Sequence, residues 1–365
     1  MLTTSPSRID RRRELDLFSS PVELTAALVD IASVSGEEKA IADVVETSLR
    51  RQCPHLEIVR DGNVVLARTH LNRPSRIILA GHLDTVPIAD NHPSRIEDGR
   101  IYGCGTTDMK SGDAVFLHLA ATIIEPKYDI TLVFYDREEI DPVTNGLGNV
   151  AIHRRSWLDA DLAILGEPTD GTVEAGCQGT IWFDIVVTGK RAHSARSWLG
   201  INAIHAATAI ADRVAAYGNP EFDIDGCVFR EGIQIVSVNG GVADNVVPDR
   251  CTMTVNYRFS PHRSLAEATR LAEELLSGPD TEVEARTAAP GALPRTGGDV
   301  ATSLVDIVGG VRAKYGWTDV SRFAALGIPA VNYGPGHPNL AHTKEEYVEA
   351  SSIESVASRL TCLIR

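Results

Sequence analysis

The sequence contains no apolar run that approaches the roughly 20 residues needed to cross a bilayer. Its first residues include Arg11, Arg12 and Arg13, but Glu14, Asp16 and two serines follow where a signal peptide would have its apolar segment. We therefore expect neither a secretory signal nor a membrane partner. A cytoplasmic location is the expectation that follows.

Cysteines are few, and they are scattered along the chain. There are six, and no two of them form a CxxC pair. Small secreted domains that rely on disulfides have a much denser pattern, so this composition does not predict a disulfide framework. We expect reduced thiols at the six positions, which are Cys53, Cys104, Cys177, Cys227, Cys251 and Cys362.

Positive charge is also in deficit. The chain has 35 lysines and arginines against 49 acidic residues, which gives a formal net charge of −14. Nucleic acids and anionic membranes attract basic surfaces, so this balance argues against both as partners. A small soluble substrate is the more natural expectation.

The length of the chain predicts two domains. At 365 residues, 43% of them hydrophobic, it exceeds the size at which one core stops growing. Strands alternate with helices up to residue 179 and again from residue 290, a pattern typical of a layered α/β domain with a mixed sheet. The expected helices there cover 22–31, 35–51, 108–124, 148–155 and 349–363, and the expected strands cover 56–60, 64–68, 77–80, 130–135, 162–165 and 330–333.

Two local signals support this assignment. Ser35-Gly36-Glu37-Glu38 has the composition of a capping box that opens a helix. Asp61-Gly62-Asn63 lies between two strand-like runs and predicts a hairpin turn. The first domain should therefore begin with helices, followed by a β-hairpin.

A second domain is expected as an insertion over residues 180–289. Its elements follow the order βαββαβ, the ferredoxin-like arrangement of an α+β domain. A segment rich in proline and glycine, residues 288–298, reads as the linker that returns to the first domain. The expected strands cover 181–187, 232–238, 251–259 and 281–286, and the helices cover 201–216 and 265–276.

Polar residues follow the expected strands, where ligand sites of α/β domains gather. His82 and Asp84 come after an apolar strand, and residues two apart in an extended chain point to the same face. Taken alone, His82 could simply cap a strand end. Glu167 closes another apolar strand, and Pro168 stiffens the chain after it.

Further acidic residues are candidates for chemistry. Asp108 follows a glycine-rich loop at an expected helix start, where it could bind cations or act as a helix cap. Glu138 and Glu139 follow a strand, and a run of acids is often no more than solvated charge. Because adjacent side chains diverge, one of the two should bind metal while the other accepts a proton from the attacking water.

A histidine near the C-terminus completes the candidate set. His337 and His342 both suit a metal on chemistry alone, and Ala341 with the expected helix start at 343–346 favours His342. Two histidines and three carboxylates, with no cysteine, suit Zn, Co or Mn. We expect two divalent ions, Zn or Co, whose charge would lower the pKa of water and polarise a carbonyl oxygen.

These residues stand in motifs that resemble the M20 family of metallopeptidases and deacylases over nearly the whole chain. The first motif is Gly81-His82-Leu83-Asp84-Thr85-Val86-Pro87, and the second runs from Tyr102 to Gly112 around Thr107-Asp108-Met109-Lys110. Glu138-Glu139, Gly166-Glu167-Pro168 and His342 then follow in the family's order. Five ordered motifs make the resemblance specific.

The resemblance implies a role for each residue. Asp108 would bridge the two metals, with a peptide bond to Met109 that family members often hold in cis. The inserted domain would form a homodimer, in which His193 crosses the interface to hydrogen-bond the oxyanion of the partner's site. The remaining implied roles are His82 and Glu167 on one metal, Glu139 and His342 on the other, Asp84 orienting His82, and Glu138 as the general base.

Within the family, four segments resemble members that remove a succinyl group from an acidic amino acid: residues 79–89, 174–179, 191–200 and 316–323. The substrate would then be an N-acyl amino acid with several carboxylates, which arginines bind in a bidentate manner. Better-known proteobacterial members carry an arginine where this chain has Gln178, and a GTSD-like segment at 317–320. Expected substrate contacts are Asn245, Arg258 and Arg322, and Arg196 is a further candidate clamp.

Two alternatives stay open. A different N-acyl-amino-acid deacylase, such as one for N-acetyl-ornithine, or a dipeptidase would use the same metal residues. A non-catalytic metal-binding scaffold would use them as well. Glu138 argues against the scaffold, because a metal cage does not require a second acid beside its ligand.

Overall fold

The computed structural model describes residues 14–365, and the chain divides into two compact units. The three arginines at 11–13 lie outside the described residues. The first unit runs to Glu174 and adds Arg295–Val311 and Leu326–Arg365, and the second comprises Ala175–Pro294 and Arg312–Ala325. None of the described helices is both long and apolar enough to cross a membrane.

The second unit extends beyond the predicted insertion of 180–289 at both ends. Cys177 forms an isolated bridge with Ala292, and the Gln178 N–H donates to the Lys314 carbonyl over 3.3 Å. The Cys177 thiol also faces the Thr318 carbonyl. These long-range backbone contacts place residues 312–325 in the second unit.

The first unit holds most of an eight-stranded mixed sheet of order β1-β2-β6-β3-β7-β18-β8-β17. Its middle strands β6, β3, β7 and β18 are parallel, whereas the hairpin β1–β2 and the pair β2–β6 are antiparallel. The predicted mixed sheet and hairpin are confirmed. The strands are β1 (Glu57–Asp61), β2 (Val64–Arg68), β3 (Arg76–His82), β6 (Asp129–Tyr135), β7 (Leu162–Leu165), β8 (Val173–Ala175), β17 (Val311–Ala313) and β18 (Ala330–Asn332).

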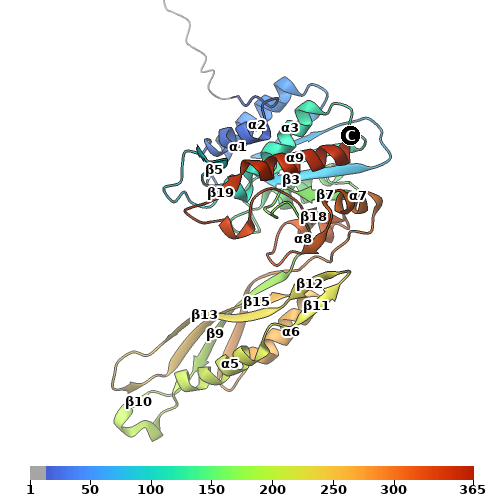
Figure 1. The fold of residues 1–365 in the computed structure, drawn as a ribbon. Coiled ribbons are helices and arrows are strands. Elements are labelled where there is room, and N and C mark those ends of the chain that lie inside the picture. The colour runs from blue at the N-terminus through green and yellow to red at the C-terminus, as the bar shows by residue number, and fades with distance from the viewer. Residues whose placement is uncertain (1–13) are drawn as a thin grey trace, which may run out of the picture. The chain divides into compact units, whose positions relative to one another are not determined.

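Helices cover this sheet, and Figure 1 shows α1, α3 and α9 lying together. The central strand β3 is buried along its apolar residues, which explains why it reads as a continuous hydrophobic run. The helices of this unit are α1 (Pro21–Val29), α2 (Lys39–Gln52), α3 (Ser111–Thr122), α4 (Gly146–His153), α7 (Asp299–Val308) and α9 (Ala350–Ile364). A separate three-stranded sheet consists of β4 (Arg95–Glu97), β5 (Arg100–Tyr102) and β19 (Tyr347–Glu349).

The predicted capping box at residues 35–38 is wrong. Helix α2 begins at Lys39, and its N-cap Glu38 makes no side-chain cap. Ser35 instead donates its hydroxyl to Asp84 Oδ2 over 2.6 Å, a partner 49 residues away in sequence. A real capping box occurs at α1, where Ser20 and Glu23 bond to each other's backbone.

The two helix starts expected beside the candidate ligands are also wrong. Asp108 lies in a short irregular turn, η1 (Thr106–Lys110), with extended φ and ψ of −120° and 95°, and α3 begins only at Ser111. The Asp108–Met109 peptide bond is cis, as the resemblance implied. The segment expected to start a helix at residue 343 forms turns and then strand β19.

The second unit contains the expected βαββαβ order, in the elements β9 (Gly179–Thr188), α5 (Ala203–Tyr217), β13 (Gly232–Gly240), β15 (Arg250–Phe259), α6 (Leu265–Leu276) and β16 (Thr281–Ala289). Its four-stranded antiparallel sheet has the order β13-β15-β9-β16, which confirms the ferredoxin-like arrangement. Alternate residues of β9 are buried against α5 and α6, as a one-sided sheet requires. Two small ribbons are added, β10 (Ala192–His193) with β14 (Val246–Val247) and β11 (Glu221–Ile224) with β12 (Cys227–Arg230).

Candidate metal centre and active site

His82 and Asp84 lie at the carboxyl end of β3, and both are buried. The His82 Nε2 atom lies 3.1 Å from Asp108 Oδ1, and its Nδ1 atom lies 3.5 Å from Asp84 Oδ1. Burial opposes ionisation of Asp84, but the hydrogen bond and charge of His82 outweigh it and lower the pKa of Asp84 to about 2. Asp84 is therefore a carboxylate placed behind the imidazole.

The same Asp84 carboxylate fixes the loop that contains the paired glutamates. It accepts backbone hydrogen bonds from Glu138 over 3.0 Å and from Glu139 over 3.1 Å, in addition to the bond from Ser35. One buried acid thus connects β3 with the loop after β6. This connection is not visible in the order of the motifs.

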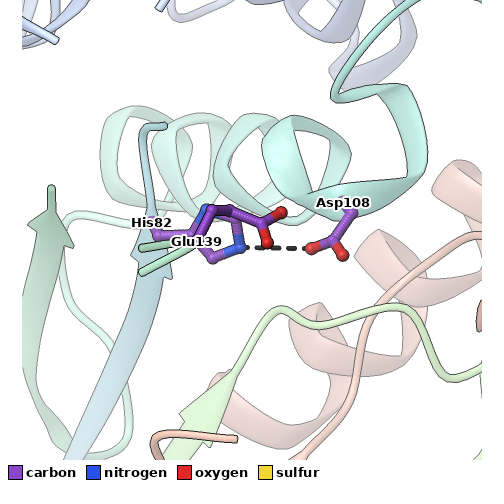
Figure 2. Close-up of side chains that lie close together, drawn as sticks. All are labelled: His82, Asp108 and Glu139. Carbon is purple, nitrogen blue, oxygen red and sulfur yellow. Dashed lines mark hydrogen bonds and ion pairs between the residues drawn. The ribbon is translucent and has the colours of Figure 1, made fainter. Parts of the chain in front are cut away.

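Three of the predicted ligands form a compact group. One side-chain ligand atom each from His82, Asp108 and Glu139 lies within 4.8 Å of the others. Figure 2 shows these side chains directed toward one another. His342 adds its Nε2 atom, 2.8 Å from Glu139 Oε1 and 3.3 Å from Asp108 Oδ2. Hydrogen bonds to Asp108 and Glu139 raise the pKa of His342 to about 10.

Glu167 is buried in the loop after β7. Strand β7 is the parallel neighbour of β3, with Leu165 paired to Ala80. The carboxyl ends of neighbouring parallel strands meet at one edge of a sheet, so Glu167 and His82 follow strands that end side by side. Its role as a ligand stays a prediction.

The donor set fits divalent cations. It consists of imidazole nitrogens and carboxylate oxygens, which bind Zn at about 2.0–2.2 Å, so ligand atoms around one ion lie within about 4 Å of each other. The compact group of His82, Asp108 and Glu139 has this spacing to within an ångström. No cysteine belongs to the group, as expected for a borderline-hard site.

Glu346 is a residue that reasoning from the sequence missed. Its buried carboxylate accepts backbone hydrogen bonds from Gly105, Thr107 and Asp108 over 3.0, 2.8 and 3.1 Å. Burial raises its pKa to about 7. The available signal is an acid four residues after His342, but the same local pattern predicts a helix start.

The other predicted residues belong to the second unit. His193 is exposed on β10, and its Nδ1 atom accepts from the Ala195 N–H over 3.1 Å, so its neutral ring has its proton on Nε2. Asn245 is exposed beside it, with its carbonyl accepting from the Ser194 N–H. Arg322 is paired with the buried Asp319.

Arg258 lines a pocket of about 430 Å³ in the same unit. Its Nε atom donates to Asn256 Oδ1 over 3.0 Å, and burial lowers its pKa. Within residues 14–365 no carboxylate pairs with Arg258. Gln178, Arg230 and Tyr315 also line this pocket.

The chain belongs to the family described as peptidase family M20/M25/M40, whose model matches residues 78–365. It is 59% identical to a Mycobacterium tuberculosis protein named as a candidate succinyl-diaminopimelate desuccinylase, DapE, over 95% of this chain and 98% of that protein. It is 52% identical to the succinyl-diaminopimelate desuccinylase of Corynebacterium glutamicum, over 95% and 96%.

Among solved structures, the aminopeptidase PepT of Bacillus cereus has a TM-score of 0.76 and 21% identity, and the match covers 95% of this chain and 98% of that one. At this identity the likeness shows the fold alone. The predicted family is confirmed, and so is the resemblance to members that remove a succinyl group.

Proposed function

We propose that the protein hydrolyses the amide bond of N-succinyl-LL-2,6-diaminopimelate, releasing succinate and LL-2,6-diaminopimelate for lysine biosynthesis. The observation that favours this reaction most is the compact group of His82, Asp108 and Glu139 at the carboxyl end of the sheet. The names of the two actinobacterial relatives support the substrate. The scattered free cysteines agree with a cytoplasmic location for this step.

Two divalent ions, zinc or cobalt, would be held by the five predicted ligands. Asp108 would serve both ions, as the two oxygens of its carboxylate lie near different histidines, His82 and His342. When bound, the ions would polarise the amide carbonyl and lower the pKa of water. The full set of proposed ligands is His82, Asp108, Glu139, Glu167 and His342.

Glu138 is the proposed general base. Its backbone is anchored by Asp84 next to Glu139, and adjacent side chains diverge, so Glu138 is the acid left to receive a proton. It would take that proton from the attacking water and pass it to the leaving amine. Asp84 would keep the His82 ring oriented throughout.

Arg258 is the proposed contact for a substrate carboxylate, with Asn245 and Arg322 as further contacts. The half-buried guanidinium of Arg258 faces a pocket and has one neutral hydrogen-bond partner, so a carboxylate could still bind it in a bidentate manner. Arg322 already neutralises Asp319, which makes it the weaker candidate. This difference ranks Arg258 first.

A homodimer through the second unit is part of the proposal. Strand β13 is an edge of its sheet, and it exposes Val236 and Val238 by 55% and 57%. Trp198 in the same unit is 76% exposed. Unpaired edges with apolar side chains favour association, and a second copy would cover them.

Turnover of N-succinyl-LL-2,6-diaminopimelate against N-acetyl-ornithine tests the substrate. A site built for several carboxylates should favour the succinyl substrate by at least about 10² in kcat/KM. Equal or faster turnover of N-acetyl-ornithine, or of a dipeptide, would replace the proposal with that activity. If the chelated protein hydrolyses none of these substrates after zinc or cobalt is restored, the interpretation that remains is the non-catalytic metal-binding scaffold.

A further inference from the structure

We propose that Glu346 is a positioning residue that holds the Asp108 loop in the geometry that binds metal. The inference rests on the proposed function only in treating Asp108 and His342 as metal ligands. It concerns metal affinity, which can be measured without any substrate.

The loop around Asp108 offers N–H groups that regular structure cannot satisfy. Gly105 has a positive φ of 85°, and Asp108 departs from helical geometry. The backbone N–H groups of Gly105, Thr107 and Asp108 all donate to the single carboxylate of Glu346. A buried N–H without an acceptor is energetically costly, so this conformation of the loop depends on that carboxylate.

Other contacts attach the chain near Glu346 to the same loop. The Gly103 N–H donates to the Glu346 carbonyl over 3.0 Å, and the Thr107 hydroxyl donates to the Tyr347 carbonyl over 2.7 Å. Strand β19 then pairs with β5. Loss of the carboxylate would leave these contacts in place, so its effect should be confined to residues 105–108.

Glu346 also connects two ligands that are remote in sequence. It bonds to the N–H of Asp108, 238 residues away, and it follows His342 by four residues. The Asp108 carboxylate lies 3.3 Å from His342 Nε2. A carboxylate that fixes both segments sets the separation of these ligands before metal binds, which reduces the ordering cost of binding.

The test is Glu346→Gln, with Glu345→Gln as the matched control. Glutamine keeps the shape and can still accept bonds through its oxygen, but its NH₂ group would face an N–H of the loop. Glu345 is exposed, so the same change there should have no effect. Zinc and cobalt affinities of both variants are measured by competition with a chelator, and thermal unfolding is measured with and without metal.

We expect Glu346→Gln to lower metal affinity by about 10- to 100-fold, as loss of supporting partners typically does. The metal-free variant should stay folded, with an unfolding temperature below that of Glu345→Gln because one loop N–H loses its acceptor, and the rise produced by metal should shrink. Wild-type affinity in the folded Glu346→Gln variant would overturn the proposal.

Glu346→Asp is the second variant, because it keeps the charge but is too short by one methylene to reach all three N–H groups. We expect weakened metal binding there as well. Failure of both variants to fold would assign Glu346 to the stability of the unit and overturn the positioning role. If wild-type protein binds metal but does not hydrolyse the succinyl substrate, only the proposed function fails.

Discussion

At the scale of single residues, the site is held by carboxylates that do not belong to the proposed ligands. Asp84 accepts from Ser35, Glu138 and Glu139, and Glu346 accepts from three backbone N–H groups. Each has its oxygens occupied by donors of the protein itself. Asp84 and Glu346 therefore serve to orient other groups. The proposed proton transfer then falls to Glu138, and the proposed metal binding to His82, Asp108, Glu139, Glu167 and His342.

Glu138→Gln should keep both metals and lose most of the turnover. The side chain is nearly isosteric and lacks only the proton acceptor. Loss of a general base costs about 10²–10⁴ in rate. Metal analysis together with kcat for the succinyl substrate measures both properties, and a near-normal kcat with full metal content would remove Glu138 from the mechanism.

Asp108→Ala should impair metal binding more than His82→Ala. A bridging carboxylate serves both ions and screens their mutual repulsion, whereas His82 serves one. Metal content after dialysis, measured on both variants, compares the two losses. Two tightly held ions in Asp108→Ala would contradict the bridging role.

At the scale of elements, an acidic residue also fixes the loop between strands β2 and β3 of the large sheet. Asp129, the first residue of β6, accepts hydrogen bonds from the Leu71 and Arg73 N–H groups and the Thr69 hydroxyl. Burial opposes its ionisation, but these bonds outweigh burial and lower the pKa of Asp129. Strands β6 and β3 are parallel, and both begin beside this loop. The loop therefore helps to set the register of the two strands, and with it the positions at which they end.

Asp129→Asn should reduce the free energy of unfolding near neutral pH by about 1.5–3 kcal/mol, as expected for hydrogen bonds to a charged group. Because the folded state lowers this pKa, the contribution is present above the ordinary value near 4 and is lost as pH falls below it. Denaturant unfolding at pH 7 and pH 3 should therefore show the difference between wild type and variant shrinking in acid.

Asp159→Asn is the control for that experiment. Asp159 pairs with Arg155 on the surface, where ion pairs contribute about 0–1 kcal/mol. Its effect should be small at both pH values. A constant difference between wild type and Asp129→Asn across this range would show that charge is not the cause.

At the scale of the whole molecule, the proposal requires two copies of the chain. His193 is exposed, and its Nε2–H is available to donate, but it belongs to the second unit while the proposed metal ligands belong to the first. The family resemblance assigns it to the oxyanion of the partner's site. Losing such a donor typically costs about 10²–10³ in kcat.

Mixing inactive His193→Ala with inactive Glu138→Gln under conditions that exchange subunits should restore activity. Half of the dimers would be heterodimers, and in each of these one site combines an intact Glu138 with the partner's intact His193. Random exchange should therefore recover roughly a quarter of wild-type activity. Confirmed heterodimers without activity would show that His193 does not act across the interface.

The sequence alone predicted the strands that locate the site, because their signals are local. Apolar runs predicted β3, β6 and β7, and the sequence also predicted the four strands of the ferredoxin-like unit in their βαββαβ order. The motif order led to His82, Asp108, Glu139 and His342, and the structure brings these side chains together. His82 and Glu139 follow the parallel neighbours β3 and β6, whose carboxyl ends meet at one edge of the sheet. Asp108 and His342 lie in turns, and the family resemblance is what predicted their place in the group.

The tertiary structure alone decided how those residues are held. Ser35 and Glu346 looked like helix-starting residues, yet each bonds to a segment far away in sequence. A hydroxyl or carboxylate beside an expected helix start has the same local sequence pattern in two cases. It can cap that helix, or it can form hydrogen bonds with a loop that is distant in sequence. Only the packed fold brings the N–H groups of Gly105, Thr107 and Asp108 to Glu346, because their acceptor is chosen by burial rather than by sequence spacing.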